Sequence, residues 1–569
     1  MTKADDSLRF SVMAVEYAEG VRSGDIVACK WIRLACERFL DDLHWQDDDE
    51  FEFEYDAERA ERVCGFIEKM PHIKGRWAAQ GKRLQLEPWQ AFLFCNAFGW
   101  IRKKDGHRRF RRVVLIVPRK NAKSTMAAAV GVYMFAADGE HGAEVYSGAT
   151  TERQAWEVFG PARLMCKKST ALTSKFGIEV NARNINIQAN ASKFEPIIGD
   201  PGDGASPTLG IVDEYHEHKT DKQFDTLETG MGARDQPMML VITTAGDNIA
   251  GPCYSLQERA QAMLERTRPA DDLFAMIYTI DAEDDWQDED ALRKANPNFD
   301  VSVSGEFLRT RQKEAMVSPR KQAIFKTKHL NVWVQSREAY FDVQRFMKAA
   351  QPKIKPEDFA DWEARLAMDL GEKRDLTALE LVFREPDKES PRYARFGWYY
   401  CPEDTIDMPE NEHLAEWRDM GLLIPTPGAV ADQRIVKEDI EELLQKFDIT
   451  EVIGDPWHSR QMLLELAEDG VDAVEFRNSP SNMNEPMREL DALITDNRLL
   501  HDGGKPFAWM LGNVVNGATK SGPGRDLHRP EKEKAENKID GPVSVIMALG
   551  RFLIDDAPRP TEVDEDYFV

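Results

Sequence analysis

The sequence lacks the features that mark secreted, disulfide-stabilised or membrane-spanning proteins. Its seven cysteines are scattered and form no Cys-x-x-Cys pair, so we expect reduced, buried thiols and neither disulfides nor a zinc site. No run of about 18 apolar residues occurs, which excludes a membrane-spanning helix. The first residues are polar and acidic and lack the apolar core of a signal peptide. These absences predict a cytoplasmic protein without a membrane partner.

Positive charge is also scarce. The chain has 74 Lys and Arg residues against 100 Asp and Glu residues, a net charge of -26. This balance argues against a protein that coats nucleic acid passively, although a local basic patch could still grip DNA. The acidic residues concentrate in segments 41–54 and 555–566, which we interpret as solvated surface.

Internal repeats and low-complexity segments are absent, and 569 residues exceed the roughly 250–300 that one core usually serves. Short apolar runs alternate with helical patterns in two regions, which predicts two α/β domains. The expected strands are 113–117, 144–147, 209–212 and 238–243 in the first region, then 366–370, 377–383, 395–400, 451–454 and 473–476. We therefore expect a helical region 1–85, a motor-like domain 86–335, a linker 336–362, a second domain 363–556 and an acidic tail 557–569.

The first chemical signal is the run 117–125, VPRKNAKST, between an apolar strand and an Ala-rich helix. A strand, a loop and a helix N-terminus form a phosphate site, in which Lys123 would reach the β- and γ-phosphates. Ser124 would place its hydroxyl on Mg²⁺, and Thr125 completes the nucleotide-binding run. Val117 and Ala122 stand where glycines are usual, so a basic turn capping a surface helix is the alternative.

A second signal follows about 90 residues later. The apolar run 209–212 ends in Asp213 and Glu214. Asp213 would hold the Mg²⁺ shell, and Glu214 would orient or deprotonate the attacking water. A helix N-cap is the simpler interpretation of either residue alone. The two signals in this order favour an ATPase.

Two weaker elements accompany them. The run 243–246, TTAG, ends another apolar strand and could sense the γ-phosphate. The run 86–90, LEPWQ, offers the amide of Gln90 to adenine, although Pro88 could simply begin a helix. Arg234 is one candidate for an arginine supplied to a neighbouring subunit.

Three aspartates of the second region follow or begin apolar elements. Asp369 and Asp455 end strands, and Asp540 precedes the apolar helix 543–553. Three convergent carboxylates need a cation to remain ionised together, and Mg²⁺ or Mn²⁺ suits oxygen ligands. Two such ions cleave phosphodiesters, so these residues predict a nuclease, although each aspartate alone is more simply a turn or cap.

Other polar residues nearby are expected to lie on the surface or to be satisfied locally. These are Asp375, Asp496, His501 and His528. The loop 517–529 carries Lys520, Arg525 and Arg529 among glycines and could follow a phosphate backbone or simply be flexible.

The run PRKNAKST resembles the deviant phosphate loop of the large terminase subunits of tailed bacteriophages, in which an early arginine contacts the nucleotide. Arg119 matches that arginine, LGIVDE matches the second ATPase motif, TTAG the coupling motif and LEPWQ the adenine-contacting segment. The runs 295–299 and 325–333 are similar to family sequence near the end of the motor.

The resemblance implies an ASCE-type P-loop NTPase domain followed by a ribonuclease-H-like nuclease domain. It further implies ATP-driven translocation of double-stranded DNA into a procapsid in the host cytoplasm and endonucleolytic cutting of concatemeric DNA. The implied cofactors are ATP with Mg²⁺ in the motor and two Mg²⁺ or Mn²⁺ ions in the nuclease site. The implied partners are the portal protein, a small terminase subunit and further copies in a ring.

Two other functions are compatible with parts of this pattern. A DNA-repair helicase-nuclease would need a second motor domain, whose motifs the sequence does not show. A nucleotide-regulated DNA-binding or assembly protein with a vestigial nuclease is disfavoured by the three intact aspartates.

Overall fold

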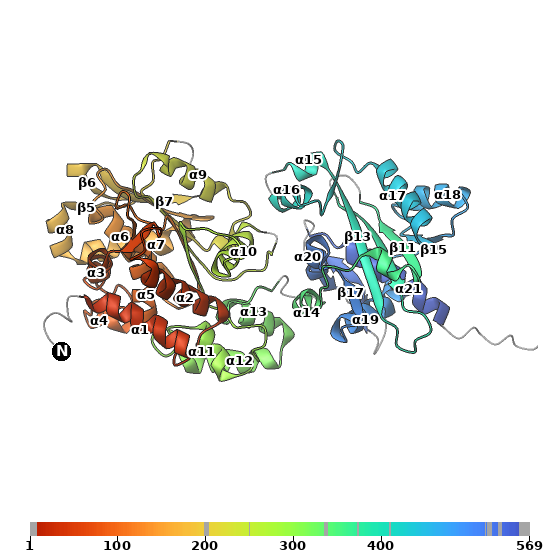
Figure 1. The fold of residues 1–569 in the computed structure, drawn as a ribbon, viewed down its shortest axis with the longest axis horizontal. Helices are drawn as coiled ribbons and strands as arrows, with labels where there is room; N and C mark the ends of the chain where they lie inside the picture. The colour runs from red at the N-terminus through yellow and green to blue at the C-terminus, as the bar shows by residue number, and fades with distance from the viewer. Residues whose placement is uncertain are drawn as a thin grey trace, which may run out of the picture. The chain divides into compact units, whose positions relative to one another are not determined.

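The computed structural model describes residues 8–198, 204–249, 251–334, 340–371, 375–408, 411–517, 519–520, 526–532 and 537–556. Two compact units, Met1–Val334 and Gln335–Val569, divide the chain (Figure 1). None of the helices in the described ranges is both long enough and apolar enough to cross a membrane.

The described part of the first unit is built around an eight-stranded sheet. Its strands lie in the order β10-β3-β9-β8-β4-β7-β6-β5, and those from β10 to β7 run parallel. Strand β9 lies between β3 and β8, which is the strand order of ASCE-type P-loop NTPases, as predicted. The bounds are β3 Arg112–Ile116, β4 Glu144–Ala149, β5 Ile178–Val180, β6 Ile185–Ile187, β7 Ser192–Ile198, β8 Leu209–Asp213, β9 Met238–Thr243 and β10 Leu273–Ile277.

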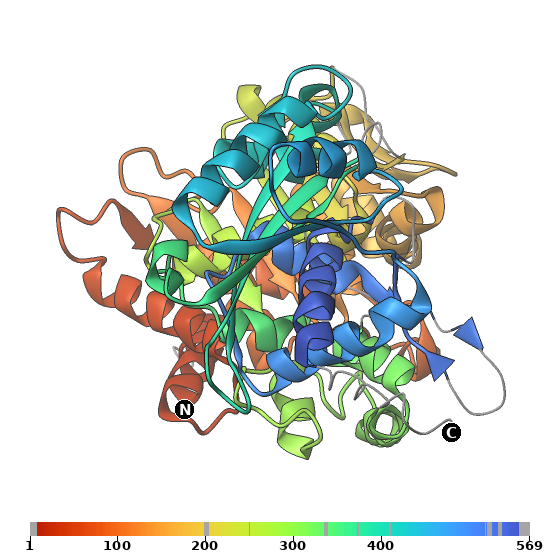
Figure 2. The ribbon, with the colours of Figure 1, turned by 90° about the vertical axis from the view of Figure 1, so that its right-hand side faces the viewer.

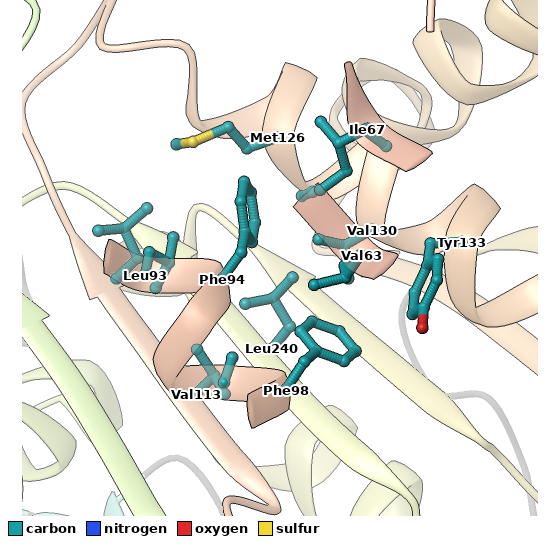
Figure 3. Packing of buried hydrophobic residues seen from close by; sticks show 14 of the residues in the cluster. Val63, Ile67, Leu93, Phe94, Phe98, Val113, Met126, Val130, Tyr133 and Leu240 are labelled. Atoms are coloured by element: carbon teal, nitrogen blue, oxygen red, sulfur yellow. The ribbon is translucent and has the colours of Figure 1, made fainter. Parts of the chain in front are cut away.

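Helices cover both faces of this sheet because alternate side chains of a strand point to opposite sides. One face packs on the N-terminal helices with α6 and α7, and the other packs on α9 and α10. Figure 3 shows Phe94 and Phe98 of α5 directed toward Val63 of α3 and Val130 of α6. The bounds are α1 Arg9–Ser23, α2 Lys30–Trp45, α3 Ala57–Ile67, α4 Gly75–Ala79, α5 Pro88–Gly99, α6 Lys123–Ala136, α7 Glu152–Lys168, α8 Thr170–Phe176, α9 Lys222–Gly230 and α10 Pro252–Leu264.

The remaining elements of the first unit extend this core. A small antiparallel pair, β1 Phe53–Tyr55 and β2 Trp100–Arg102, joins the N-terminal helices. Helices α11 Glu289–Ala295, α12 Gly305–Met316 and α13 Pro319–His329 pack around a separate small cluster that includes Leu292 and Phe325. The region 1–85 therefore contributes to the core of the first unit.

The second unit has a sheet in the order β14-β13-β12-β11-β15-β16, with β17 paired to β13. Strands β11, β12 and β13 are antiparallel neighbours, whereas β15 and β16 run parallel to β11. This arrangement is the predicted ribonuclease-H-like topology. The bounds are β11 Glu363–Asp369, β12 Thr377–Arg384, β13 Tyr393–Pro402, β14 Ile424–Thr426, β15 Ile449–Gly454, β16 Ala473–Glu475 and β17 Leu499–His501.

Alternation along β11 decides where its terminal aspartate lies. Leu366 and Met368 pack with α17 Gln433–Lys446 and α18 Arg460–Glu468. The opposite face carries α21 Asp540–Asp556, which crosses β11 and β12 (Figure 2). Asp369, two residues after Ala367, therefore shares the α21 face. The other bounds are α14 Val343–Lys348, α15 Glu403–Ile406, α16 Glu412–Asp419, α19 Pro480–Thr495, α20 Lys505–Asn513, β18 Val514–Asn516, β19 Thr519–Lys520, β20 Asp526–Leu527 and β21 Pro530–Lys532.

All nine strands expected from the sequence are present, with small shifts at their ends. The strands that were not anticipated are β1, β2, β5 to β7, β10, β14 and β17 to β21. The segment 336–362, expected to be a linker, packs within the second unit from Tyr340 onward, where the Tyr340 N–H donates to the Val514 carbonyl at 2.9 Å. Phe346 stacks on His501 with ring centroids 3.6 Å apart. Arg525 of the loop 517–529 and the tail 557–569 lie outside the described residues.

A buried ion pair ties the N-terminal helices to the sheet, and its loss should destabilise the first unit. Arg109 Nη1 donates to Asp42 Oδ2 at 2.8 Å, with side-chain exposures of 2% and 6%. Arg109→Met leaves a buried carboxylate facing only Arg38, which we expect to cost about 3–5 kcal/mol in thermal unfolding. Arg309→Met breaks an exposed pair with Glu289 and should change the unfolding temperature little. Equal effects of the two substitutions would contradict the assignment.

Candidate functional site

The phosphate loop keeps a glycine-like backbone without glycine. Lys120 and Ala122 have φ values of 73° and 63°, in the left-handed region that usually favours glycine. Ala122 is the N-cap of α6, so its small side chain stands directly before the helix N-terminus. The loop therefore keeps the backbone conformation of a glycine-containing phosphate loop although alanine replaces the glycine. The left-handed conformation costs about 1–2 kcal/mol of stability for each residue that is not glycine.

Lys123 is the first residue of α6, and its ammonium has no hydrogen-bond acceptor. The residue is 6% exposed, and its Nζ lies 3.2 Å from Glu214 Oε1 without the alignment of a hydrogen bond. A buried cation at a helix N-terminus, with donors to spare, fits the phosphates of a nucleotide. Thr125 follows in the first turn of α6 and is partly exposed.

Asp213 is 1% exposed and lies beside Ser124, whose Oγ donates to Asp213 Oδ2 at 3.3 Å. Burial and the neighbouring Glu214 carboxylate raise the pKa of Asp213 to about 7. A carboxylate beside a hydroxyl at a phosphate loop is a suitable pair of Mg²⁺ ligands. A bound Mg²⁺ would also offset the repulsion between Asp213 and Glu214 that contributes to the raised pKa. The structure thus brings Ser124 and Asp213 together as the sequence predicted.

Glu214 occupies a left-handed backbone position, with φ 50°, that turns its side chain toward Lys123. Its second oxygen, Oε2, lies 3.3 Å from Nδ1 of His216. Thr243 and Thr244 at the end of β9 are fully buried, and the Thr243 hydroxyl lies 3.0 Å from the same His216 nitrogen. The sequence did not predict a role for His216; its place two residues after Glu214 puts it near the site but does not indicate which groups it contacts.

A set of asparagines holds the phosphate loop from behind. The Asn121 amide donates to the Pro118 carbonyl at 3.1 Å and to Asn296 Oδ1 at 3.0 Å. The Asn298 N–H donates to Asn121 Oδ1 at 3.0 Å, and Trp89 Nε1 donates to Asn298 Oδ1 at 2.8 Å. These contacts give the run 295–299, noted above only for its similarity to family sequence, a structural role as a support of the phosphate loop. They also bring the LEPWQ element to the loop through Trp89.

A second asparagine anchors the coupling motif in the same way. Asn331 Oδ1 accepts from the Ala245 N–H at 2.6 Å, and its amide donates to the Tyr278 carbonyl. The Arg119 N–H donates to the Lys328 carbonyl at 3.1 Å, so the segment 325–333 contacts both the loop and the TTAG turn. The Arg119 side chain is exposed.

Two residues have local partners that bear on their expected roles. Gln90 Oε1 accepts from the Glu87 N–H at 3.0 Å in a capping box that begins α5, which is the helix-start interpretation of this element. Arg234 donates to the carbonyls of Ser206 at 2.9 Å and Gly142 at 2.8 Å, and its side chain is 13% exposed. That guanidinium holds the two strand ends of its own chain together.

In the second unit, parallel pairing brings two aspartates to one sheet edge. Met368 of β11 pairs with Gly454 of β15. Asp369 and Asp455, the next residues along the two strands, therefore lie side by side at the same edge of the sheet. Asp455 accepts the Trp457 N–H on Oδ1 at 2.8 Å and the Asn478 N–H on Oδ2 at 2.9 Å. The strand-end loops therefore fix the Asp455 carboxylate.

Asp540 begins α21 near Asp369. Burial, then Asp540 and Asp455, raise the pKa of Asp369 well above its ordinary value. Burial and Asp375 raise the pKa of Asp540 to about 7, and its Oδ2 is buried without a hydrogen-bond partner. Asp369 thus lies within electrostatic reach of both Asp540 and Asp455.

Asp375 was expected on the surface, and the structure corrects this expectation. Its charge raises the pKa of both Asp369 and Asp540, and it forms an ion pair with Lys538 Nζ at 2.5 Å. The short turn between β11 and β12 brings it back beside the strand end, which the sequence spacing did not reveal. Asp375 is therefore a fourth carboxylate of this site.

The carboxylates of Asp369, Asp375, Asp455 and Asp540 are suitable ligands for a divalent metal ion, although they do not converge on a single position. Among the described residues, no three His, Cys, Asp or Glu side chains form a group that could hold an ion as they stand. Mutually repelling carboxylates and an unpartnered buried oxygen are nevertheless the environment that a hard cation stabilises. Small side-chain rotations would have to accompany binding.

A buried polar network supports the start of α21. Glu380 and Arg395, each at most 1% exposed, form a charge-assisted pair at 2.6 Å, and the Tyr399 hydroxyl donates to Glu380. A side chain at Gly541 would meet Glu380 Oε1 at 3.2 Å, so the network lies directly behind Asp540. No local pattern in the sequence indicates this network.

Of the other polar residues considered in the sequence, Asp496 lies on the surface as expected, whereas His501 and His528 each have one buried ring nitrogen without a hydrogen-bond partner. Asp496 is exposed and lies 3.8 Å from Arg498. His501 is buried against Phe346, and burial with the nearby Arg395 lowers its pKa to about 4. His528 packs edge-on against Tyr340. All seven cysteines are free and buried, as expected.

Comparison with known proteins matches two consecutive parts of the chain to one family. The family model for the terminase large subunit ATPase domain matches residues 88–262, and that for the terminase large subunit endonuclease domain matches residues 268–556. Protein YmfN of Escherichia coli (strain K12) is 40% identical over 362 residues, which is 62% of this chain and 79% of that protein.

Two further similarities involve Enterobacteria phage HK97. Its protein described as terminase, large subunit, is 25% identical over 509 residues, which is 86% of this chain and 95% of that protein. The crystal structure of the HK97 large terminase has 22% identity and a TM-score of 0.45, covering 87% of this chain and 99% of that one. The chain belongs to the terminase large subunit family and joins an ATP hydrolase to a DNA endonuclease.

Proposed function

We propose that ATP bound at Lys123 drives double-stranded DNA into a procapsid and that the carboxylates around Asp369 cut concatemeric DNA. The observation that carries this proposal is that one chain holds both a nucleotide-ready loop and a convergent carboxylate edge. A repair helicase has no support, because the two large sheets of the described chain are one motor and one nuclease.

In the motor, the residues around the loop take separate roles. Lys123, Ser124 and Thr125 bind the phosphates, and Arg119, exposed at the loop, contacts them from outside. Asp213 and Ser124 would hold Mg²⁺, which neutralises charge on the β- and γ-phosphates. Glu214 orients and deprotonates the attacking water. Gln90 binds adenine only if its amide nitrogen reaches the base, since its oxygen caps α5.

In the nuclease, Asp369, Asp455 and Asp540 would hold two Mg²⁺ or Mn²⁺ ions. Such a pair activates the attacking water and stabilises the leaving oxygen. Asp455 is already oriented by two backbone N–H groups, whereas Asp540 keeps an oxygen free for a ligand. Asp375 and Lys538 lie beside these residues and adjust their charge.

The assembly we propose is a ring of copies on the portal protein, with a small terminase subunit that selects DNA. We assign the motor to 86–335 and the nuclease to 363–556. Arg234 supports its own strand ends, so the arginine that reaches a neighbouring ATP is expected elsewhere on the motor surface.

The first prediction separates binding from hydrolysis in the motor. Lys123→Ala should lose ATP binding, because the cation that faces the phosphates is gone. Glu214→Gln should still bind ATP and lose hydrolysis by about 10²–10⁴-fold, the range of a general base. Equilibrium binding and single-turnover hydrolysis measure the two effects. Lys168→Ala, an exposed lysine at the end of α7, is the control, and normal turnover in Lys123→Ala would refute the phosphate site.

The second prediction concerns cutting. Asp455→Ala should abolish plasmid nicking in Mn²⁺ while ATP hydrolysis persists, because Asp455 is expected to ligate metal and lies in the second unit. Asp496→Ala, an exposed aspartate of the same unit, should cut normally. Unchanged nicking by Asp455→Ala, or none by wild type, would refute the nuclease assignment.

The third prediction follows from the raised pKa of Asp540. Its value of about 7 exceeds the ordinary 3.9 or so of an unfolded aspartate, so the folded state favours the protonated form. Without metal, this contribution to stability is complete below about pH 4 and is lost as pH rises through about 7. Mn²⁺ should restore more stability at pH 8 than at pH 6, because its ligands must be deprotonated.

Thermal unfolding in EDTA and in Mn²⁺ measures this dependence. Asp540→Asn should remove part of the metal-free pH dependence and most of the stabilisation by Mn²⁺. Asp496→Asn should behave like wild type in both buffers. If Asp540→Asn and wild type have superimposable profiles, the Asp540 carboxyl does not titrate as described.

A further inference from the structure

His216 lies where three parts of the ATPase site meet. It is 7% exposed in the turn Tyr215–Glu217, directly after the catalytic-glutamate position. Its Nδ1 lies 3.0 Å from Thr243 Oγ1 and 3.3 Å from Glu214 Oε2, and its Nε2 lies 3.2 Å from Lys328 Nζ. One imidazole therefore touches the glutamate, the coupling motif and the segment 325–333.

The partners of His216 determine which ring nitrogen carries the proton. An ammonium only donates, so the contact from Lys328 makes Nε2 the acceptor and leaves the hydrogen on Nδ1. The Thr243 hydroxyl donates to the Thr244 carbonyl at 3.0 Å and already accepts the His216 N–H at 3.1 Å. The Nδ1–H therefore donates to Thr243 Oγ1, and Glu214 Oε2, which has no hydrogen-bond partner, lies 3.3 Å from the same nitrogen, where a small rotation would let it accept that hydrogen. Burial, followed by Lys328, Lys123 and Arg119, lowers the pKa of His216 to about 2, which keeps the ring neutral.

Lys328 is fixed at both ends of its residue. Its carbonyl accepts the Arg119 N–H of the phosphate loop at 3.1 Å, and its ammonium donates to His216. The charged groups that face this ammonium are Arg119, Glu214, Glu217 and Asp247. A shift of the phosphate loop is thus transmitted to His216 through a single residue.

The Glu214 carboxylate lies between two side chains, one on each oxygen. Its Oε1 faces Lys123 at 3.2 Å, and its Oε2 faces His216 at 3.3 Å. ATP phosphates carry more negative charge than one carboxylate and would draw the Lys123 ammonium away from Glu214. The contact with His216 does not use any group that the phosphates would claim, so it remains.

We propose that His216, oriented by Lys328, is the positioning residue that holds Glu214 toward the attacking water once ATP has engaged Lys123. This inference rests on the proposed ATPase function and adds to it a defined route from the glutamate to the segment 325–333. That segment ends next to Val334, the last residue of the first unit. Movement of the segment would thereby alter the orientation of Glu214 without touching the nucleotide.

Two isosteric substitutions separate the two nitrogens. The Asn amide lies where Nδ1 does, and the Gln amide reaches the place of Nε2. His216→Asn can still donate to Glu214 and should keep hydrolysis within about threefold of wild type. His216→Gln should resemble His216→Ala and lose about 10- to 100-fold in kcat, a part of the contribution of a general base. KM for ATP should change little in all three variants, because His216 does not contact the nucleotide.

Single-turnover hydrolysis by the full chain, with ATP binding and thermal unfolding measured in parallel, makes the comparison. His107→Asn is the control: His107 lies between β2 and β3 and contacts Asp105 and Arg102, so kcat should be unchanged. Lys328→Met should lower kcat, and its effect should largely vanish when His216→Ala is already present.

The outcomes distinguish this inference from the function on which it rests. Wild-type protein that neither binds nor hydrolyses ATP would refute both the ATPase and the role of His216. Normal hydrolysis that fails in Lys123→Ala, together with equal kcat in His216→Asn and His216→Gln, would refute only the positioning role. Additive effects of Lys328→Met and His216→Ala would show that Lys328 does not act through His216.

Discussion

Repulsion between carboxylates held at the ends of buried strands is the constraint on which both halves of the chain depend. Asp213 stands against Glu214, and Asp369 stands against Asp540, in places where water cannot screen their charges. Such an arrangement destabilises the ligand-free fold above neutral pH, and a cation or a phosphate-bound lysine relieves it. Stability and function are therefore linked at each site, because the ligand that enables chemistry also stabilises the local structure.

In the phosphate loop, contacts with distant residues hold a backbone conformation that glycine would otherwise favour locally. A glycine would adopt the backbone of Ala122 without strain, yet the loop is held in the same conformation by Asn121 and its partners Asn296 and Asn298. Because these partners come from a segment about 175 residues downstream, the loop depends on the folding of the whole unit. This dependence places the end of the motor in direct contact with the nucleotide site.

The sequence predicted nine of the strands, the phosphate loop, the acidic pair and the positions of the three aspartates in the second unit because each follows a local rule. Apolar runs mark buried strands, and polar residues at their ends mark sites. Asp375, His216 and the Glu380 network escaped prediction for a common reason. Their roles arise from turns and cross-strand neighbours that bring distant residues together, and a single sequence does not record such distances. The roles of the predicted site residues remain proposals, although their placement agrees with them.

The segment 325–333 connects the phosphate loop, the turn that contains His216 and the TTAG turn. Asn331 holds the TTAG turn, Lys328 holds both the phosphate loop and His216, and the first unit ends at Val334. Hydrogen bonds join the segment to the phosphate loop, to His216 and to the TTAG turn, so a shift in any of these would be felt by the segment. Coupling requires an element with two arrangements that both sites bias. In this chain the element with contacts to every catalytic loop of the motor is also the one that leads out of it.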